Sequence, residues 1–96
     1  MKNIDSEVAW AVRRKEWFAD CNTIVSYDEK NDTWKLVLHG SEIANGHYEH
    51  GSPVVDFASF CGYYTNVTIR RLNAIGVDTK ELAKKEKVGK YEEQGE

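Results

Sequence analysis

Residues 52–77 read SPVVDFASFCGYYTNVTIRRLNAIGV, and the way this stretch folds decides the architecture of the chain. Ser52 followed by Pro53 is typical of a helix start, because serine caps a helix and proline is tolerated in its first turn. Apolar residues then recur at helical spacing as far as Cys61, and Gly62 predicts the end of the helix. The pattern therefore predicts a short helix followed by a glycine turn.

A second helix is predicted after this turn. Thr65 or Asn66 provides its cap, and Gly76 stands where a left-handed residue ends many helices. The segment 63–69, YYTNVTI, is β-branched and aromatic, so a strand is the alternative. The helical period that continues through RRLNAI favours the helix.

The two predicted helices resemble the A-x-x-L-G…T-[IV]-x-R-x-L…G-V pattern of helix-turn-helix regulators. The resemblance is carried by Ala58, Cys61, Gly62, Thr68, Ile69, Arg70, Leu72, Gly76 and Val77. Its turn departs from the family pattern, since it holds Tyr63 and Tyr64 and is about one residue longer. The resemblance implies that the second helix presents polar side chains to bases and phosphates. These candidate nucleic-acid-binding residues are Asn66, Thr68, Arg70 and Arg71. The alternative is a plain helical hairpin with two solvated arginines.

The flanking sequence predicts the remaining elements. Residues 5–21 fit an amphipathic helix, and residues 23–39 fit a β-hairpin in which TIVSYD and TWKLVLH pair across EKND. Residues 40–52 are either two more strands that turn at Asn45-Gly46 or a loop. Asp78 starts a capping box, which predicts a third helix over ELAKKEK.

The expected fold class is α+β. It has an N-terminal helix, a β-hairpin or short meander, and two or three short C-terminal helices in a helix-turn-helix-like arrangement. A length of 96 residues and a hydrophobic share of 41% fit one globular core. We expect residues 1–89 to form a single small domain and residues 90–96, KYEEQGE, to be a disordered tail.

Composition narrows the environment and the partners. The net charge of −3 weighs against a strong nucleic-acid binder, because phosphate contacts favour a basic surface. No apolar run reaches the roughly 18 residues of a membrane span, and the N-terminus lacks a secretory signal. We therefore expect a cytoplasmic protein with no membrane partner. Cys21 and Cys61 are expected to be small buried hydrophobes on helix faces.

A candidate protein-binding face lies on the predicted first helix. Helical spacing places Trp10, Arg13, Arg14 and Trp17 together. Tryptophan and arginine are the residue types that dominate binding hot spots. The alternative is that both tryptophans pack on the sheet while the arginines reach solvent.

Metal binding and catalysis find little support in the sequence. His47-x-x-His50 has ligand chemistry but lacks the second ligand pair of a structural zinc site. A dyad of Cys61 with His39, or of Cys21 with His50, needs a proximity that the sequence does not show. No catalytic motif is present, so we expect a non-enzymatic binding protein with no cofactor and no metal.

Two functions remain. The first is a small regulatory protein that binds nucleic acid through residues 52–77, as a monomer or a homodimer. The second is a stoichiometric inhibitor or adaptor, of a viral or mobile-element type, that occludes a larger host protein. The first predicts an affinity that falls steeply with salt, and the second an exposed aromatic patch with weaker salt dependence. For the first, replacing Arg70 and Arg71 with alanine is expected to abolish function without unfolding the protein.

Overall fold

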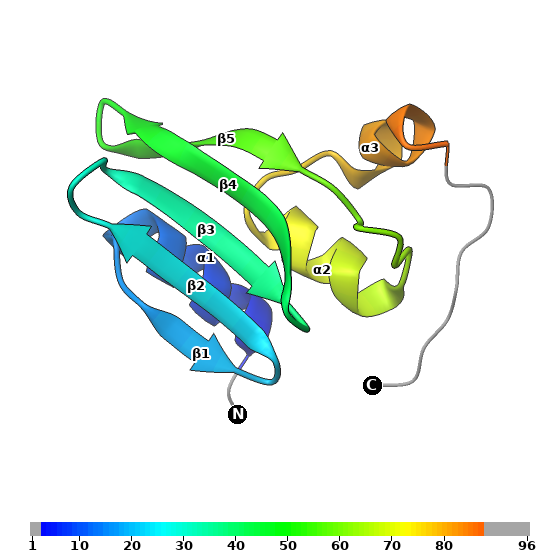
Figure 1. Ribbon diagram of the computed structural model, residues 1–96, viewed down its shortest axis with the longest axis horizontal. Coiled ribbons are helices and arrows are strands. Elements are labelled where there is room, and N and C mark those ends of the chain that lie inside the picture. Colours follow the sequence, from blue (N-terminus) through cyan, green and yellow to red (C-terminus); the bar gives the residue numbers. More distant parts are fainter. Residues whose placement is uncertain (1–2, 88–96) are drawn as a thin grey trace.

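Five antiparallel strands form a sheet in the order β1-β2-β3-β4-β5, so that strands adjacent in sequence pair with one another (Figure 1). The computed structural model describes residues 3–87. The strands are β1 (Phe18–Asp20), β2 (Thr23–Asp28), β3 (Thr33–Leu38), β4 (Ser41–Glu49) and β5 (Ser52–Ala58). Short turns connect them, so the sheet is a meander.

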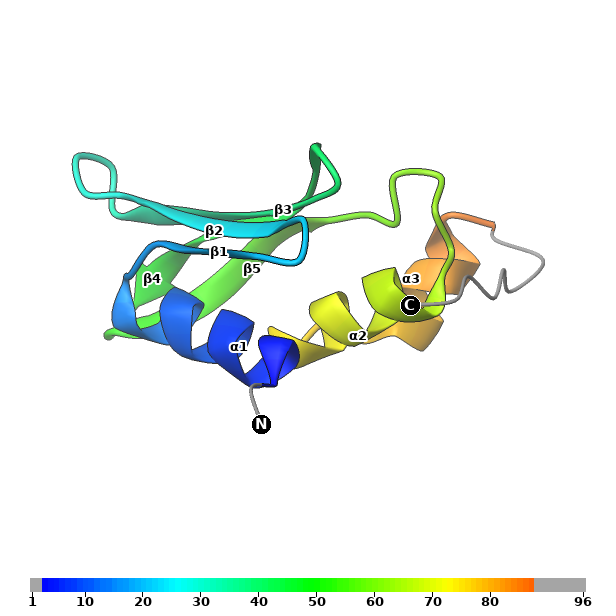
Figure 2. The ribbon, with the colours of Figure 1, turned by 90° about the horizontal axis from the view of Figure 1, so that it is seen from below.

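Three helices occur in residues 3–87: α1 (Ile4–Arg14), α2 (Asn66–Ala74) and α3 (Thr79–Lys85). Figure 2 shows α1 and α2 on one side of the sheet and α3 beyond the end of β5. Helix α1 contacts β1, β2 and β5 as well as α2. The opposite, outer face of the sheet carries no helix of the described segment. None of the helices in this part of the chain is long and apolar enough to cross a membrane.

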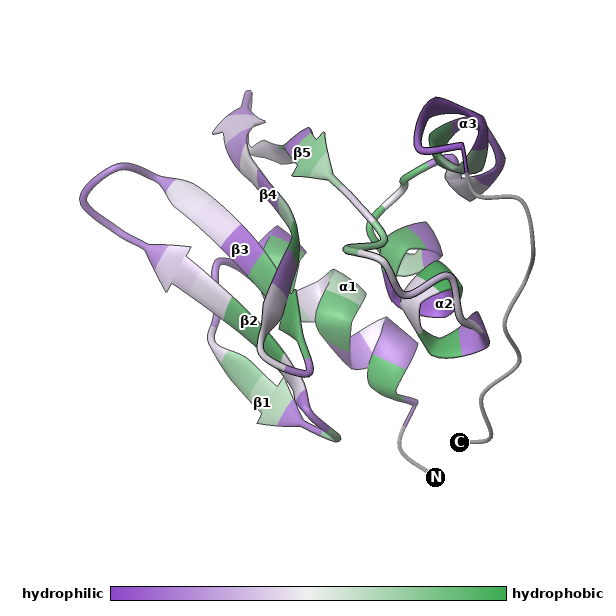
Figure 3. Cartoon of the chain, turned by 45° about the vertical axis from the view of Figure 1, so that its right-hand side comes forward, coloured by the Kyte–Doolittle hydropathy of each residue, from purple (hydrophilic) through white to green (hydrophobic). Residues whose placement is uncertain are grey.

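The core lies between these helices and the inner face of the sheet. Its largest member is Trp34, which is 1% exposed. Figure 3 shows hydrophobic colour where α1 and the strands face each other, and hydrophilic colour on the β2–β3 turn and on much of α3. The buried apolar residues are Val8, Ala11, Val12, Val25, Trp34, Leu36, Leu38, Ile43, Ala44, Phe60, Val67, Leu72 and Leu82.

Helix α1 is shorter than the predicted helix over residues 5–21. Asn3 caps its start by accepting a hydrogen bond from the Ser6 N–H at 3.2 Å. Lys15 ends it in the left-handed region at φ 61°, with its N–H bonded back to helix carbonyls. The chain then forms strand β1 in place of the last part of the predicted helix.

The predicted first helix of the helix-turn-helix is strand β5, so the expected helix-turn-helix-like arrangement is wrong. His50 and Gly51, at φ 54° and 80°, form a tight turn that folds the chain back onto β4. Pro53 then pairs opposite Tyr48, in a strand at the edge of the sheet where a missing N–H is tolerated. The molecule is accordingly a five-stranded sheet with three helices in residues 3–87.

Asn45-Gly46 is not a turn but lies inside β4. Glycine is needed there for close packing, since a Cβ at Gly46 would lie 1.8 Å from the Val54 carbonyl oxygen and 2.7 Å from the Trp34 ring. Residues 40–52 thus belong almost entirely to β4, its turns and the start of β5. The segment is strand and not loop, but it forms one strand where two strands turning at Asn45-Gly46 were predicted.

The hairpin of β2 and β3 and the last two helices confirm local predictions. The Thr65 side chain caps α2 by accepting from the Thr68 N–H, and the segment 63–69 therefore leads into a helix, not a strand. Asp78 caps α3 through the N–H groups of Lys80 and Glu81. The predicted tail over residues 90–96 lies outside the described residues.

Neither cysteine occupies a helix face, so that prediction is wrong. Cys21 is exposed at φ 49° in the turn between β1 and β2. Cys61 is partly buried at φ 52° in the loop before α2, where its thiol donates to the Glu42 carbonyl at 3.3 Å. Both positions follow from the replacement of predicted helix by strand and turn.

Candidate functional site

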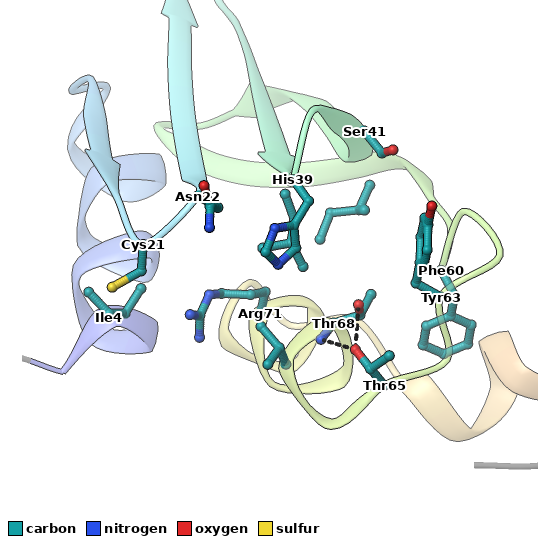
Figure 4. Close-up of a pocket in the computed structure, with 13 residues that line it drawn as sticks. Ile4, Cys21, Asn22, His39, Ser41, Phe60, Tyr63, Thr65, Thr68 and Arg71 are labelled. Carbon is teal, nitrogen blue, oxygen red and sulfur yellow. Dashed lines mark hydrogen bonds between the residues drawn. The ribbon is translucent and has the colours of Figure 1, made fainter. Parts of the chain in front are cut away.

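A cavity of about 650 Å³ lies at one end of the sheet, between the β1–β2 turn, the β3–β4 turn and α2. We call it the turn-end cavity. Figure 4 shows Ile4 and Cys21 on one side of it, Phe60 and Tyr63 on the other, and His39 above Arg71. Its thirteen lining residues are Ile4, Cys21, Asn22, Leu38, His39, Ser41, Ile43, Phe60, Tyr63, Thr65, Val67, Thr68 and Arg71.

Two tight turns shape the mouth of this cavity. Cys21 and Asn22 have φ 49° and 58°, and His39 and Gly40 have φ 51° and 81°. Positive φ at both central residues is the type I′ geometry that matches the twist of antiparallel strands. The hairpins β1–β2 and β3–β4 therefore bring the side chains of these turns to the same end of the sheet.

Arg71 forms the charged wall of the cavity and is only 2% exposed. Its Nε donates to the Thr23 hydroxyl at 3.2 Å, and its Nη1 donates to the Asp5 carboxylate at 2.6 Å. These bonds join α2 to β2 and α1, which makes Arg71 a structural anchor. Asp5 also lies 3.6 Å from the Nε of Arg70.

The structure separates the four predicted nucleic-acid-binding residues. Asn66 is exposed and Arg70 is half-buried, whereas Thr68 and Arg71 are each 2% exposed. The Thr68 hydroxyl lies 3.0 Å from that of Thr65. The expectation that all four project into solvent is therefore wrong, because α2 turns the face with Thr68 and Arg71 inward, where Arg71 bonds to Asp5 of α1 and Thr23 of β2.

Trp10 and Trp17 are both exposed, at 48% and 71%. Arg14 lies over the Trp10 ring, with its guanidinium carbon 4.3 Å from the ring centroid. Arg13 is also exposed, in the last turn of α1. Trp17 lies beyond the end of the helix and lines a hollow with residues of the β2–β3 hairpin, so the four residues do not share a helix face. They lie instead along residues 10–17, which cover the end of α1 and its link to the edge strand β1, and which we call the α1–β1 corner.

A polar cluster fixes this corner to the β2–β3 hairpin. Lys15 Nζ lies 2.9 Å from the Asp32 carboxylate, and the Tyr27 hydroxyl donates to the same carboxylate at 2.6 Å. The hydrogen bond to Asp32 raises the pKa of Tyr27 to about 12, and the Tyr27 hydroxyl in turn lowers the pKa of Asp32. Tyr48 donates to the Val12 carbonyl, and burial raises the pKa of Tyr48 to about 12.

A family model described as Kyanoviridae Gp96 protein matches residues 1–93. The chain belongs to this Gp96 family. It is thus a small viral protein, of phage origin, which confirms the viral type expected for the protein-binding alternative. No match to the chain is found among curated proteins or among solved structures.

The outer face of the sheet in this Gp96-family protein carries a second polar cluster. His47 on β4 has Nδ1 2.8 Å from Asp56 and Nε2 2.8 Å from Glu49. The hydrogen bonds to Asp56 and Glu49 raise the pKa of His47, and the one to Asp56 contributes more. Two carboxylates at two ring nitrogens favour the doubly protonated imidazolium.

The three histidines of the Gp96-family protein lie in different places. His39 and His50 occupy turns at opposite ends of β4, and His47 lies on the outer face. Within residues 3–87, no group of three or more histidine, cysteine and acidic side chains is arranged to hold a metal ion.

The turn-end cavity is not predicted from the sequence. From the sequence, His39 is a candidate for a dyad with Cys61, and Cys21 is expected to be a buried hydrophobe or part of a dyad with His50. A signal was available in His39-Gly40 and His50-Gly51, since a glycine in second place between alternating segments favours a two-residue hairpin.

Proposed function

We propose that this viral protein is a non-enzymatic binding protein that occludes a larger host protein in a stoichiometric complex. Its contact surface is the α1–β1 corner, with Trp10, Arg14 and Trp17 as anchors and Arg13 beside them. The exposure of two tryptophans, at 48% and 71%, carries the proposal. The fold buries Trp34 to 1% exposure, so a tryptophan left in solvent is not forced by the size of the core.

The side chains of the α1–β1 corner are held in place before any partner binds. Arg14 already lies over Trp10, and the cluster around Lys15 holds the end of α1 against the hairpin. Side chains that are ordered before association lose less conformational entropy when a partner arrives. Tryptophan and arginine also give the largest losses in alanine scans of interfaces.

Nucleic acid is a weaker candidate for the partner. The segment predicted as the first helix of the helix-turn-helix forms strand β5. Thr68 and Arg71, two of the predicted contact residues, are buried. The net charge of −3 adds an unfavourable long-range field for a polyanion.

The test compares two double variants of the full-length protein by affinity capture from nuclease-treated host lysate. The corner variant is Trp10→Ser with Trp17→Ser. The matched control is Ile24→Ser with Phe57→Ser, which removes apolar side chains of 41% and 43% exposure from other positions. Quantitative mass spectrometry identifies the retained protein, and light scattering of the purified complex gives its stoichiometry.

Wild type and control are expected to retain one host protein at near-equal stoichiometry. The corner variant is expected to bind it about thirtyfold or more weakly, since a hot-spot tryptophan contributes roughly 2 kcal/mol or more. Far-UV circular dichroism checks that all three proteins are folded. Equal retention by the corner variant contradicts the proposed surface. A parallel capture without nuclease that recovers nucleic acid, lost at moderate salt, and no stoichiometric protein contradicts the proposed function.

A further inference from the structure

The turn-end cavity has the size and floor of a small-molecule site. Its volume of about 650 Å³ falls within the roughly 300–1,000 Å³ of typical ligand pockets. Ile43 and Phe60, which are 2% and 1% exposed, contribute to an apolar floor between the two turns. Close-packed interiors leave few voids of this size, so the space is a candidate for an apolar ligand body.

The charge of the cavity wall is one-sided. Among the thirteen described residues that line it, Arg71 is the permanently charged one, and none is aspartate or glutamate. The protein as a whole has 16 acidic and 13 basic residues, so a wall without carboxylates differs from its average surface. Thr65 and Thr68, at the amino end of α2, also line the cavity, and the helix dipole adds positive potential there.

Arg71 is also held in place. Its bonds to Thr23 and to Asp5 orient the guanidinium, and Asp5 is not among the lining residues. The Asp5 carboxylate offsets part of the Arg71 charge, but it also lies 3.6 Å from Arg70 Nε, so two guanidinium groups share one carboxylate. The remaining positive charge of this fixed side chain acts on a ligand more strongly in this partly enclosed, apolar setting than it would in water. Ligand binding therefore does not have to order this side chain.

We infer that the turn-end cavity binds a small amphipathic anion, with an apolar body of drug-like size and an acidic head group such as a carboxylate or sulfonate. The apolar body lies against Ile43 and Phe60, and the head group faces Arg71 and His39. This site shares no residue with the α1–β1 corner, so it stands or fails independently of the proposed protein partner.

The test uses a matched pair of fluorescent probes on the full-length protein. Anilinonaphthalene sulfonate carries an aromatic body and an anionic head, and phenylnaphthylamine has the same body without the charge. Saturable binding of the sulfonate at one site per chain is expected, with an affinity about tenfold or more above that of the neutral probe. Amide chemical-shift changes in nuclear magnetic resonance spectra are expected at the two turns and at the start of α2.

Charge variants at two equivalent turns locate the site. His39→Asp adds a carboxylate to the wall, whereas His39→Asn is its neutral counterpart, and both replacements tolerate positive φ. His50→Asp and His50→Asn are the controls, because His50 has φ 54° beside Gly51, as His39 has φ 51° beside Gly40, but does not line the cavity. His39→Asp is expected to bind the sulfonate about tenfold more weakly than His39→Asn, with no such difference at His50.

Three outcomes overturn the inference. The neutral probe binds as tightly as the sulfonate, the substitutions at His50 act as strongly as those at His39, or the shift changes fall on the α1–β1 corner. Thermal melts of each variant, monitored by near-ultraviolet circular dichroism, exclude binding to a loosened core. Arg71 is left unchanged in this experiment because it anchors the fold.

Discussion

Two helices each carry a pair of adjacent arginines, Arg13-Arg14 on α1 and Arg70-Arg71 on α2, and the fold uses them differently. Arg14 is exposed over the Trp10 ring, whereas Arg71 is 2% exposed and bonded to Asp5 and Thr23. The same dipeptide thus serves as surface in one helix and as an internal anchor in the other. Local spacing does not distinguish them, because the difference depends on which elements each helix packs against.

The largest expected effect separates the two arginines by stability. Arg71→Ala removes the buried partner of an ion pair whose Asp5 side chain is 30% exposed, and is expected to lower the free energy of unfolding by about 3 kcal/mol. Arg14→Ala is expected to change it by no more than about 0.5 kcal/mol, as is usual for an exposed position. Urea unfolding followed by circular dichroism measures both values. Similar losses in the two variants would remove the distinction between anchor and surface.

This difference also affects how the Arg70→Ala and Arg71→Ala double variant can be used to test nucleic-acid binding. Replacing Arg70 and Arg71 together removes the anchor, so lost function in that variant does not separate a missing contact from a damaged fold. The α1–β1 corner permits a cleaner experiment, since its tryptophans and Arg14 are exposed.

A smaller effect sharpens the role of Asp5 as the partner of Arg71. Asp5→Asn keeps an oxygen acceptor near Nη1 but removes the charge, and is expected to cost about 1–3 kcal/mol. Glu7→Gln is the matched control, because Glu7 lies in the same first turn of α1. In the Arg71→Ala background, Asp5→Asn is expected to cost much less, with a coupling of about 0.5–3 kcal/mol by urea unfolding. Strict additivity would mean that the two residues stabilise the fold independently.

The parts of the fold that follow from local chemistry were predictable. The Asp78 cap marks α3, the Thr65 cap marks α2, and the β-rich segments on either side of EKND give the β2–β3 hairpin. Strand β5 was missed because Ser52-Pro53 suits a helix start and an edge strand equally well. The deciding interaction is its pairing with β4 after the His50-Gly51 turn.

The candidate sites also differ in how far the sequence predicts them. Trp10 and Trp17 could be identified from their residue type, but their exposure depends on the early end of α1 at Lys15. The turn-end cavity needs two separate hairpin turns and α2 to meet at one end of the sheet. No spacing within a single segment encodes that meeting, so periodicity alone does not predict it.

The smallest effect concerns His47, whose exposed ion pairs contrast with the ion pair of the buried Arg71. Asp56 and Glu49 raise the pKa of His47 above its ordinary value of 6.5, which is the value expected in the unfolded chain. The stabilisation from these pairs is therefore fully present below pH 6.5 and is lost as the pH rises through the raised pKa of the folded state. The melting temperature of wild type should exceed that of His47→Gln by at most a few degrees at pH 6 and converge with it by about pH 9. His50→Asn, at an exposed turn, is the control and should show no such convergence. A difference in melting temperature between wild type and His47→Gln that stays constant from pH 6 to pH 9 would mean that His47 stabilises β4 and β5 by packing. The ion pairs would then contribute little, as is usual for exposed pairs that solvent screens.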